Sequence, residues 1–489
     1  MRSFRLSLLF PILAVFTCLA QTPVEQVIAE ALKPSALDNN LERLTDRIGG
    51  RVPGTPAMEK AVQWGIEVFK VAGADGVHTE SFSIPASWAE GATSMTIVAP
   101  EQFKVRAISL AWAPALAPQR HVPIIDVGEG NAEDFAKAGS VAGAIVLVHS
   151  EEMHTWADLF GEYMRVPVTI DLAVKGKAIA IALQSTRPHD LLYRHSNSPE
   201  GGIDRLPGIQ VAREDAARIS RLLASGQKLY ADISVPNRVG GATTTSNVIA
   251  ELRGRQDEKP DEYVVLGAHL DSWELGTGAL DNGCNAALVV DALRAIQASG
   301  QRPRRSIRFI LFSGEEQGLV GSHAYVTAHR SEMDKVAAMV VLDAGIGKVT
   351  GFSLGGRKDV LDAVNELATP LKQFDAANMT TDATYGTDNF DFLLEGVPTL
   401  MANQVEENYL INYHAMSDTF DKVDLARLKQ HVAEAAAITF AIADAPQRVG
   451  PRLTHDQIAQ TLSETHLDDQ MKGFGVWDDW ATGKRGRQK

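Results

Sequence analysis

Seven carboxylate and imidazole side chains stand where short apolar runs of the chain end, or in the loops that follow such runs. They are His269, Asp271, Asp281, Glu315, Glu316, Asp343 and His414. A single strand-end aspartate usually caps a helix, and a lone histidine is usually a surface or core residue. Seven such groups in one pattern are hard to assign to capping. Because imidazole and carboxylate are ligands that suit zinc, the set predicts a metal site with open positions for water.

A pair of metal ions would use this many acids. Ions about 3.5–4 Å apart can share one carboxylate and stabilise both the attacking and the leaving oxygen of a hydrolysis. Such a centre needs a bridging acid, one histidine and one further acid for each ion, and an extra acid that handles protons. The neighbours Glu315 and Glu316 fit two of these roles, since one can bind metal while the other faces the bound water.

The elements that must position these groups alternate between strand and helix. Short β-rich apolar runs predict strands over 263–268, 307–312, 338–342 and 397–402, and helical spacing predicts helices over 24–32, 36–48, 57–72, 285–299, 316–329 and 425–443. This alternation is typical of an α/β fold with a mixed, largely parallel sheet sandwiched by helices. Ligands of such sheets bind beyond the carboxyl ends of the strands, so we expect the seven groups to converge there.

The texture of the chain changes between about residues 120 and 234. Short apolar runs there alternate with Gly, Pro and charged residues, which indicates a small mixed α/β module inserted into the main one. We therefore expect five parts. They are a signal peptide at 1–20, the first part of the catalytic domain at 21–115, an insert at 116–236, the rest of the catalytic domain at 237–448 and a C-terminal extension at 449–489.

Charge and composition exclude some classes of partner. Lys and Arg total 47 against 61 Asp and Glu, which gives a net charge of −14. An acidic surface without a basic stripe repels a phosphate backbone, so nucleic acid is not expected as a partner. The basic residues at 484–489 are expected to form only a solvated tail. Hydrophobic residues make up 45% of the chain, which is enough for a buried core.

The N-terminus has the pattern of an export signal. Arg2 and Arg5 precede an uncharged stretch over 6–20 with small residues at its end, so we expect cleavage near Ala20 and a secreted or periplasmic protein. A lipid-attached Cys18 is the rival interpretation. Cleavage leaves Cys284 alone, so no internal disulfide is expected. No later stretch is long and apolar enough for a membrane helix, so no integral membrane segment is expected after signal removal.

Several motifs together resemble those of metallopeptidase family 28. The strings GAHLDS (267–272), GALDNG (278–283) and GEEQG (314–318) carry the resemblance, and Leu342-Asp343 and HAMSDT (414–419) continue it in order. Within the family, IGGRVPGT (48–55) and GTD (386–388) are most similar to the subgroup of carboxypeptidase Q and its bacterial relatives. The resemblance covers roughly residues 24–445 and includes an insert similar to the protease-associated domain.

The resemblance implies a zinc exopeptidase fold, two Zn²⁺ per chain and hydrolysis of peptides or dipeptides at a chain end. One zinc would take His269, Asp281 and Asp343, and the other Asp281, Glu316 and His414. Glu315 would be the general base, and Asp271 would orient His269 through its other ring nitrogen. Two departures from the family, Cys284-Asn285 after the bridging acid and Asn389 after Asp388, remove no ligand but bear on the substrate pocket. A homodimer is a further expectation.

Other assignments stay open at this point. GFSLG (351–355) fits a nucleophile elbow, and Ser353, Asp388 and His414 follow the order of a serine α/β-hydrolase. Family resemblance also admits a glutaminyl cyclase or a non-catalytic relative. Glu151-x-x-His154 imitates a di-iron motif but occurs once, so we interpret it as surface decoration. The end of the peptide that is recognised also stays open, with Tyr385, Tyr409 and Tyr413 as candidate donors to a carboxylate.

Overall fold

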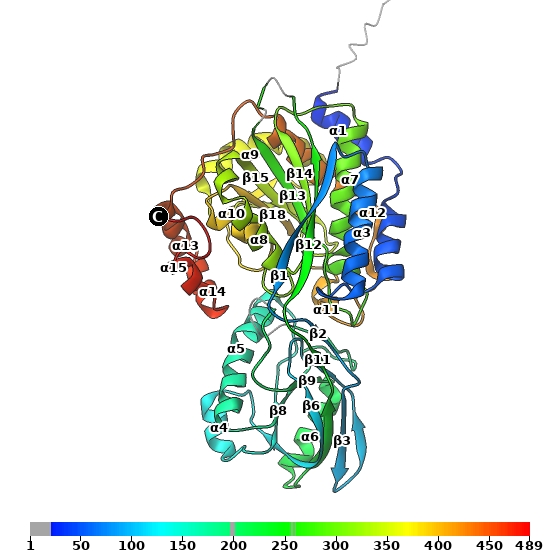
Figure 1. The fold of residues 1–489 in the computed structure, drawn as a ribbon, viewed down its shortest axis with the longest axis vertical. Helices are drawn as coiled ribbons and strands as arrows, with labels where there is room; N and C mark the ends of the chain where they lie inside the picture. Colours follow the sequence, from blue (N-terminus) through cyan, green and yellow to red (C-terminus); the bar gives the residue numbers. More distant parts are fainter. Residues whose placement is uncertain (1–20, 196–200, 256–257, 260) are drawn as a thin grey trace, which may run out of the picture.

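The computed structural model describes residues 21–195, 201–255, 258–259 and 261–489. The predicted signal peptide at 1–20 lies outside these ranges. Two eight-stranded sheets organise the chain, and they occupy opposite ends of an elongated molecule (Figure 1). Within the described ranges, no helix is both long enough and apolar enough to cross a membrane.

The main sheet has the strand order β1-β12-β14-β13-β15-β18-β16-β17. Its centre consists of four parallel strands, β14 (Ser306–Phe312), β13 (Tyr263–His269), β15 (Val336–Val341) and β18 (Thr399–Gln404). The antiparallel strands β1 (Gly76–Ile84) and β12 (Thr243–Leu252) complete one edge, and β16 (Val349–Ser353) and β17 (Asn378–Thr380) complete the other. The predicted fold class, mixed and largely parallel α/β, is confirmed.

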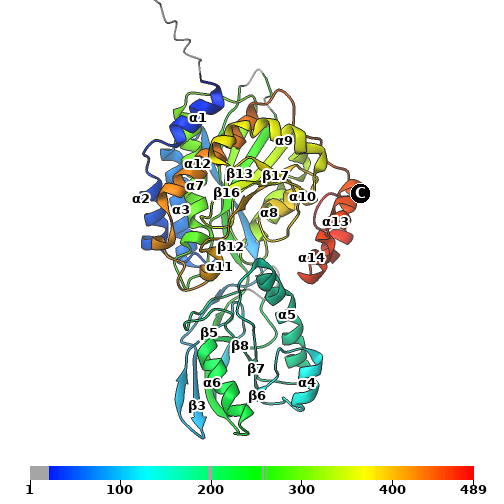
Figure 2. The ribbon, with the colours of Figure 1, turned by 180° about the vertical axis from the view of Figure 1, so that it is seen from behind.

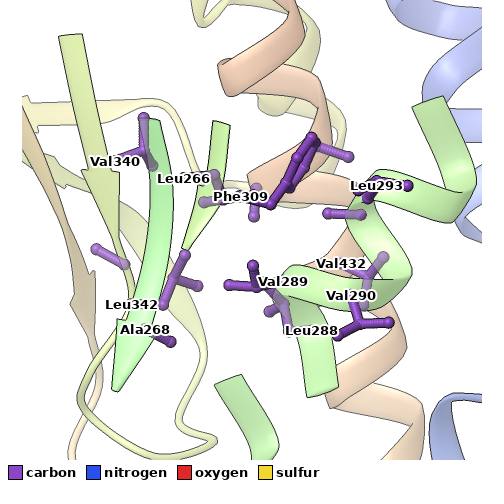
Figure 3. Close-up of a cluster of buried hydrophobic side chains, with 14 of the residues drawn as sticks. Leu266, Ala268, Leu288, Val289, Val290, Leu293, Phe309, Val340, Leu342 and Val432 are labelled. Atoms are coloured by element: carbon purple, nitrogen blue, oxygen red, sulfur yellow. The ribbon is translucent and has the colours of Figure 1, made fainter. Parts of the chain in front are cut away.

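Alternate residues of the central strands pack on opposite faces of the main sheet. In β13, Val264 and Leu266 belong to the large core under α7 (Cys284–Ala298) and α12 (Leu425–Asp444). Val265 points to the other face, where α8 (Val320–Ala328) and α10 (Asn389–Leu394) lie. Figure 3 shows Leu288 and Val289 of α7 facing Leu266, Ala268 and Leu342 of the sheet. Burial on both faces explains why these strands read as continuous apolar runs.

Four more helices lie on the face of α7: α1 (Pro23–Ala31), α2 (Leu37–Glu42), α3 (Pro56–Val71) and α9 (Leu361–Leu367). A π-helical turn, η1 (Arg43–Ile48), follows α2. Their residues join the same core. The helix expected over 316–329 begins later, because α8 starts only at Val320. Gly318 (φ 106°) and Leu319 (φ 64°) have left-handed backbone that interrupts a helix. Glu315 and Glu316 therefore lie in a turn and not in the first turn of a helix.

The second sheet has the order β4-β3-β10-β6-β7-β8-β9-β5. Four of its strands are parallel: β6 (Leu116–Asp126), β7 (Ile145–Val148), β8 (Ala180–Gln184) and β9 (Gly208–Val211). The antiparallel strands are β3 (Ser94–Ala99), β4 (Phe103–Val105), β5 (Ala107–Ser109) and β10 (Tyr230–Val235). The helices α4 (Ala132–Ala138), α5 (Trp156–Lys175) and α6 (Arg213–Ala224) belong with it (Figure 2). The sheet thus starts before residue 116, and the protease-associated-like insert stays a prediction.

The C-terminal extension forms three helices, α13 (His455–Glu464), α14 (Leu467–Gly473) and α15 (Trp477–Ala481). Both ribbon views place α14 beside α5 of the second sheet (Figures 1 and 2). The expectation of a solvated tail is wrong for Arg485, which is buried. Its guanidinium donates from Nε and Nη2 to the two carboxylate oxygens of Asp391, each at 2.8 Å. A bidentate pair of this kind fixes the end of the chain to α10.

Candidate metal centre

Strand ends and irregular loops bring the predicted ligands together. His269 is the last residue of β13, and Asp343 follows β15 by two residues. Asp281 lies in the non-helical part of a short turn, η3 (Ala279–Gly283), just before α7. Glu316 lies in the turn after β14, and His414 follows the short helix α11 (Tyr409–Asn412) with a left-handed backbone (φ 57°). Parallel strands end at one edge, so these segments converge there.

The five side chains form two groups that share Asp281. In the first, His269 Nε2 lies 3.2 Å from Asp281 Oδ1 and 3.0 Å from Asp343 Oδ1. In the second, His414 Nε2 lies 3.2 Å from Asp281 Oδ2 and 2.8 Å from Glu316 Oε2. The ligand atoms of each group all lie within 4.8 Å of one another. The carboxylate of Asp281 thus faces His269 with one oxygen and His414 with the other.

Asp418 holds the loop that carries Asp281. Its carboxylate accepts hydrogen bonds from three successive backbone amides, those of Ala279 (3.1 Å), Leu280 (2.6 Å) and Asp281 (3.1 Å). The guanidinium of Arg51, which is fully buried, donates to the carbonyl of Gly278 at 2.8 Å in the same loop. These bonds compensate backbone groups that an irregular buried loop would otherwise leave unpaired.

Asp271 is close to both His269 and the paired glutamates. His269 Nδ1 lies 3.0 Å from the backbone carbonyl oxygen of Asp271 and 3.7 Å from its carboxylate. The side chain of Asp271 was predicted to orient His269, but its backbone carbonyl lies closer to this nitrogen than its carboxylate does. The carboxylate instead accepts hydrogen bonds from the backbone amides of Glu315 and Glu316, each at 3.3 Å. Asp271 thus ties the turn of the paired glutamates to the end of β13.

Buried carboxylates outnumber cations at this edge of the sheet. Burial raises the pKa of Glu316 to about 7 and that of Glu315 well above its usual range. Burial alone would lower the pKa of His414, but the charges of Glu316 and Asp281 outweigh it and raise that pKa to about 9. Glu316 Oε1 is buried and accepts no hydrogen bond from the described residues. A site with several close carboxylates and two imidazole Nε2 atoms suits divalent cations, because a bound cation offsets the repulsion among the carboxylates.

His195, in the segment between β8 and β9, reaches this edge, and no spacing in the sequence pointed to it. Its Nδ1 lies 2.8 Å from Nδ1 of His414, and the hydroxyl of Tyr163 lies 3.1 Å from the same atom. The backbone of the segment 191–195 also pairs with the loop of His414: the amide of Arg194 donates to the carbonyl of His414 at 3.1 Å. Burial lowers the pKa of His195 to about 4, so its imidazole is neutral at pH 7.

Comparisons with known proteins agree with this arrangement. The model of Peptidase family M28 matches residues 247–439, which contain all seven predicted groups. The resemblance to family M28 that the motifs predicted is thus confirmed. Carboxypeptidase Q of Rattus norvegicus is 27% identical over 403 residues, which are 82% of this chain and 84% of the rat protein.

Two solved structures share the fold. The peptidase M28 precursor from Shewanella amazonensis has a TM-score of 0.80 and 27% identity, over 88% of this chain and 98% of that one. BSAP, a zinc aminopeptidase from Bacillus subtilis, has a TM-score of 0.65 and 19% identity, over 83% of this chain and 93% of that one. Both structures therefore agree with the α/β fold predicted for the chain, and the first of them agrees with the M28 resemblance as well.

A cavity of about 580 Å³ opens onto the two groups of this M28 centre. Three parts of the chain line it: the strand-end loops of the main sheet, helix α5, and the segment 473–476 of the C-terminal extension. The predicted donors Tyr385, Tyr409 and Tyr413 all line it as well. Its size falls within the range of about 300–1,000 Å³ that is typical of small-ligand sites.

The alternative motifs are not assembled into sites. The hydroxyl of Ser353 donates to the backbone carbonyl of Asp382 at 2.6 Å, whereas His414 faces Asp281 and Glu316. Burial and the charge of Asp418 raise the pKa of the Cys284 thiol far above its usual range, so this cysteine is a neutral core residue. Glu151 and His154 are exposed and lie outside any helix. These motifs leave the buried charges around Asp281 unexplained, whereas bound cations would offset them.

Proposed function

We propose that the protein is an exported two-zinc exopeptidase of family M28, which hydrolyses the peptide bond nearest a chain end. The observation that carries the proposal is the pair of three-residue groups that share Asp281. One zinc would be held by His269, Asp281 and Asp343, and the other by Asp281, Glu316 and His414. Imidazole and carboxylate donors with few ligands per ion suit zinc in a catalytic site, because positions stay open for water and substrate.

Bound zinc would polarise the scissile carbonyl and lower the pKa of the attacking water. Glu315 is the residue that moves the proton. Its Oε2 lies 4.0 Å from His269 Nε2, so its carboxylate borders the first group without belonging to either one. Burial raises its pKa above that of an exposed glutamate, and a bound cation would favour the ionised form that a base needs. We assign it to take the proton from the water and to pass it to the leaving amine, while Asp271 holds its backbone in place.

The charges of the cavity favour a substrate with a free amino group. Its acidic lining residues are Asp281, Glu315, Glu316 and Asp343, and no Lys or Arg occurs among its described lining residues. Two bound zinc ions would offset these four charges, but a substrate carboxylate would still find only neutral donors such as the tyrosine hydroxyls, whereas a free amine can bind at an open metal position. We therefore propose that the free amino end of a peptide or dipeptide is bound at the metal end of the cavity.

Metal dependence and end preference test the proposal together. Purified protein is incubated with a panel of dipeptides and tripeptides, each with a free or acetylated amino end, and the products are followed by mass spectrometry. Chelation should abolish hydrolysis, zinc should restore it, and acetylation should block it. A serine-directed fluorophosphonate should have no effect. Inactivation with labelling of Ser353 would overturn the zinc mechanism, and cleavage of acetylated peptides at the carboxyl end would overturn the end assignment.

Export and assembly are parts of the proposal with their own tests. We propose cleavage near Ala20, so N-terminal sequencing of the secreted or periplasmic protein should begin near Gln21. A cytoplasmic product that begins at Met1 would contradict export. Light scattering of the mature protein measures whether it forms the expected homodimer, and a monomer mass at all concentrations would contradict that expectation.

A further inference from the structure

A tight turn presents Phe474 at the end of helix α14. The amide of Val476 donates to the carbonyl of Met471 at 2.9 Å, and the amide of Gly475 donates to that of Lys472 at 3.2 Å. Gly475 has a φ of 75°, which a residue with a side chain rarely adopts. This pair of bonds around a left-handed glycine is the Schellman motif, so the backbone on both sides of Phe474 is fixed.

The helices that carry this turn are anchored to the main sheet. Tyr385, which precedes α10, donates its backbone amide to the side-chain Oε1 of Gln470 at 3.0 Å. The buried Arg485–Asp391 pair holds the end of the extension on α10. One apolar cluster joins the extension to the catalytic part, and it contains Leu319, Phe390, Leu393, Leu394, Ile458, Leu462, Leu467, Met471, Val476 and Trp480. The turn is therefore part of the packed structure.

The ring of Phe474 packs against aromatic rings from two other parts of the chain. Its centroid lies 4.6 Å from that of Tyr385, 5.8 Å from that of Tyr163 and 6.3 Å from that of Phe160. Tyr163 and Phe160 belong to α5. The contact between α14 and α5 is close, because a Cβ built on Gly473 would lie 2.1 Å from Met164 Sδ. Phe474 thus fills the junction where the three parts that line the cavity meet.

This junction continues to the metal centre through Tyr163. The hydroxyl of Tyr163 lies 3.1 Å from the hydroxyl of Tyr413 and 3.1 Å from Nδ1 of His195, which contacts His414. The lining contributed by α5 and the extension carries no charged side chain. A substrate group that extends from the metal centre toward α5 and the extension therefore contacts an uncharged, mainly aromatic surface. Such a surface distinguishes substrates by size and shape.

We propose that Phe474 is a specificity-determining residue whose ring limits the size of the substrate side chain next to the scissile bond. The inference rests on the proposed exopeptidase function and adds to it a role for the C-terminal extension. A wall that restricts volume makes small side chains fit and large ones collide. A change of one methylene in such a pocket typically alters kcat/KM by about 10–200-fold, so removal of a whole ring should have a large effect.

The test compares Phe474→Ala and Phe474→Leu with the wild type. The kcat/KM values of Ala-Ala, Leu-Ala, Phe-Ala and Trp-Ala are measured with zinc present. In Phe474→Ala, the ratio of the Trp-Ala value to the Ala-Ala value should rise by at least about tenfold, with an intermediate rise in Phe474→Leu. Zinc content should equal that of the wild type. A ratio that stays constant or falls would overturn the proposal, whatever the overall loss of activity.

A matched control is Trp477→Ala, which removes another aromatic ring of the extension. Trp477 packs on the same apolar cluster but does not line the cavity. Its loss should lower the melting temperature and leave the ratio unchanged. An equal rise of the ratio in Trp477→Ala would also overturn the proposal, because it would show a general loosening of the extension.

A second measurement separates this inference from the proposed function. Dissociation constants of reduced-bond analogues of Ala-Ala and Trp-Ala are measured by calorimetry, which needs binding but no hydrolysis. Phe474→Ala should tighten binding of the Trp analogue relative to the Ala analogue by at least about tenfold. If the wild type hydrolyses no peptide but Phe474→Ala shows this shift in binding, only the exopeptidase assignment is refuted. A wild type that hydrolyses peptides without any shift in the variant refutes only the role of Phe474.

Discussion

Two parallel-strand edges in this molecule carry polar side chains, and they differ in how their charges are balanced. In the second sheet, Asp126 ends β6 and His149 follows β7, and the two side chains pair at 2.8 Å with exposures of 26% and 37%. Ser220 donates to the same carboxylate at 2.9 Å. In the main sheet, His269 ends β13 and Asp281 lies in the turn before α7, and the exposures of their side chains are only 1% and 4%.

The difference lies in charge balance under burial. At the edge of the second sheet, one imidazole faces one carboxylate, and the neighbouring Gln184 accepts a hydrogen bond from Ser150 at 3.1 Å. At the edge of the main sheet, the carboxylates exceed the imidazoles and are almost fully buried, which is unfavourable unless cations are bound. The position of a histidine or carboxylate at a strand end therefore does not by itself indicate a metal centre. An excess of buried like charge does, and the predictions below test that criterion.

The largest effect is expected from the shared carboxylate. Asp281→Ala should empty both zinc sites and lower activity by more than the about 10²–10⁴-fold that loss of one acid–base group costs. Zinc per chain, measured by plasma mass spectrometry, checks this. The matched control is Asp126→Ala at the other edge, which should leave zinc and activity unchanged. An Asp281→Ala protein that keeps two zinc ions would remove the bridging assignment and the criterion with it.

The paired glutamates should separate chemistry from metal binding. Glu315→Gln keeps the shape of the side chain but removes its basic oxygen, so turnover should fall by about 10²–10⁴-fold while zinc and KM stay the same. Glu316→Gln should lose zinc first and activity as a consequence. Kinetics and zinc content are measured on the same preparations, with the exposed Glu151→Gln as control. An active Glu315→Gln enzyme would exclude this residue as the general base.

A smaller effect is expected at His195, where the segment between β8 and β9 contacts the loop of His414. If His414 binds metal through Nε2, its Nδ1–H has Nδ1 of His195 as acceptor. Loss of such a partner typically weakens metal binding about 10–100-fold, so His195→Leu should bind zinc that much more weakly in a chelator competition. His195→Asn places an amide oxygen near the lost acceptor and should restore most of the affinity. Unchanged zinc affinity in His195→Leu would show that the contact has only a packing role.

Sequence reasoning predicted best where one local pattern decides the structure. The run 263–268 is buried on both faces of the sheet, so it reads as a strand without any tertiary information, and β13 spans Tyr263–His269. The family motifs likewise named all five residues of the two groups. The helix expected over 316–329 was wrong at its start, because left-handed backbone at Gly318 and Leu319 is a tertiary feature that helical spacing does not reveal.

Contacts between segments that are distant in the sequence could not be predicted. His195 and His414 are 219 positions apart, and the pairing of segment 191–195 with the His414 loop helps to bring them together. Strand β3 was not expected, because its partly exposed residues give a weak apolar alternation. The role of Phe474 also depends on packing between three parts of the chain. Local periodicity contains no information on such contacts. The candidate metal ligands can be recognised from the sequence, because histidines and carboxylates clustered at strand ends are unusual.

The smallest effect concerns the balanced pair of the second sheet. The hydrogen bond to Asp126 raises the pKa of His149 above its usual 6.5, although burial opposes this. A raised folded-state pKa means that the pair stabilises the fold fully below about pH 6.5 and that this contribution is lost as pH rises through the folded pKa. Because both side chains are partly solvated, we expect only about 0.2–1 kcal/mol. Hydrogen exchange of β6 and β7 peptides measures the local opening free energy. His149→Gln should lower it relative to wild type at pH 5.5, and the difference should shrink by pH 8.5, while zinc content stays constant. The exposed His154→Gln serves as control and should show no pH-dependent difference. A His149→Gln deficit of equal size at both pH values would mean that packing, and not a charged pair, holds this edge together.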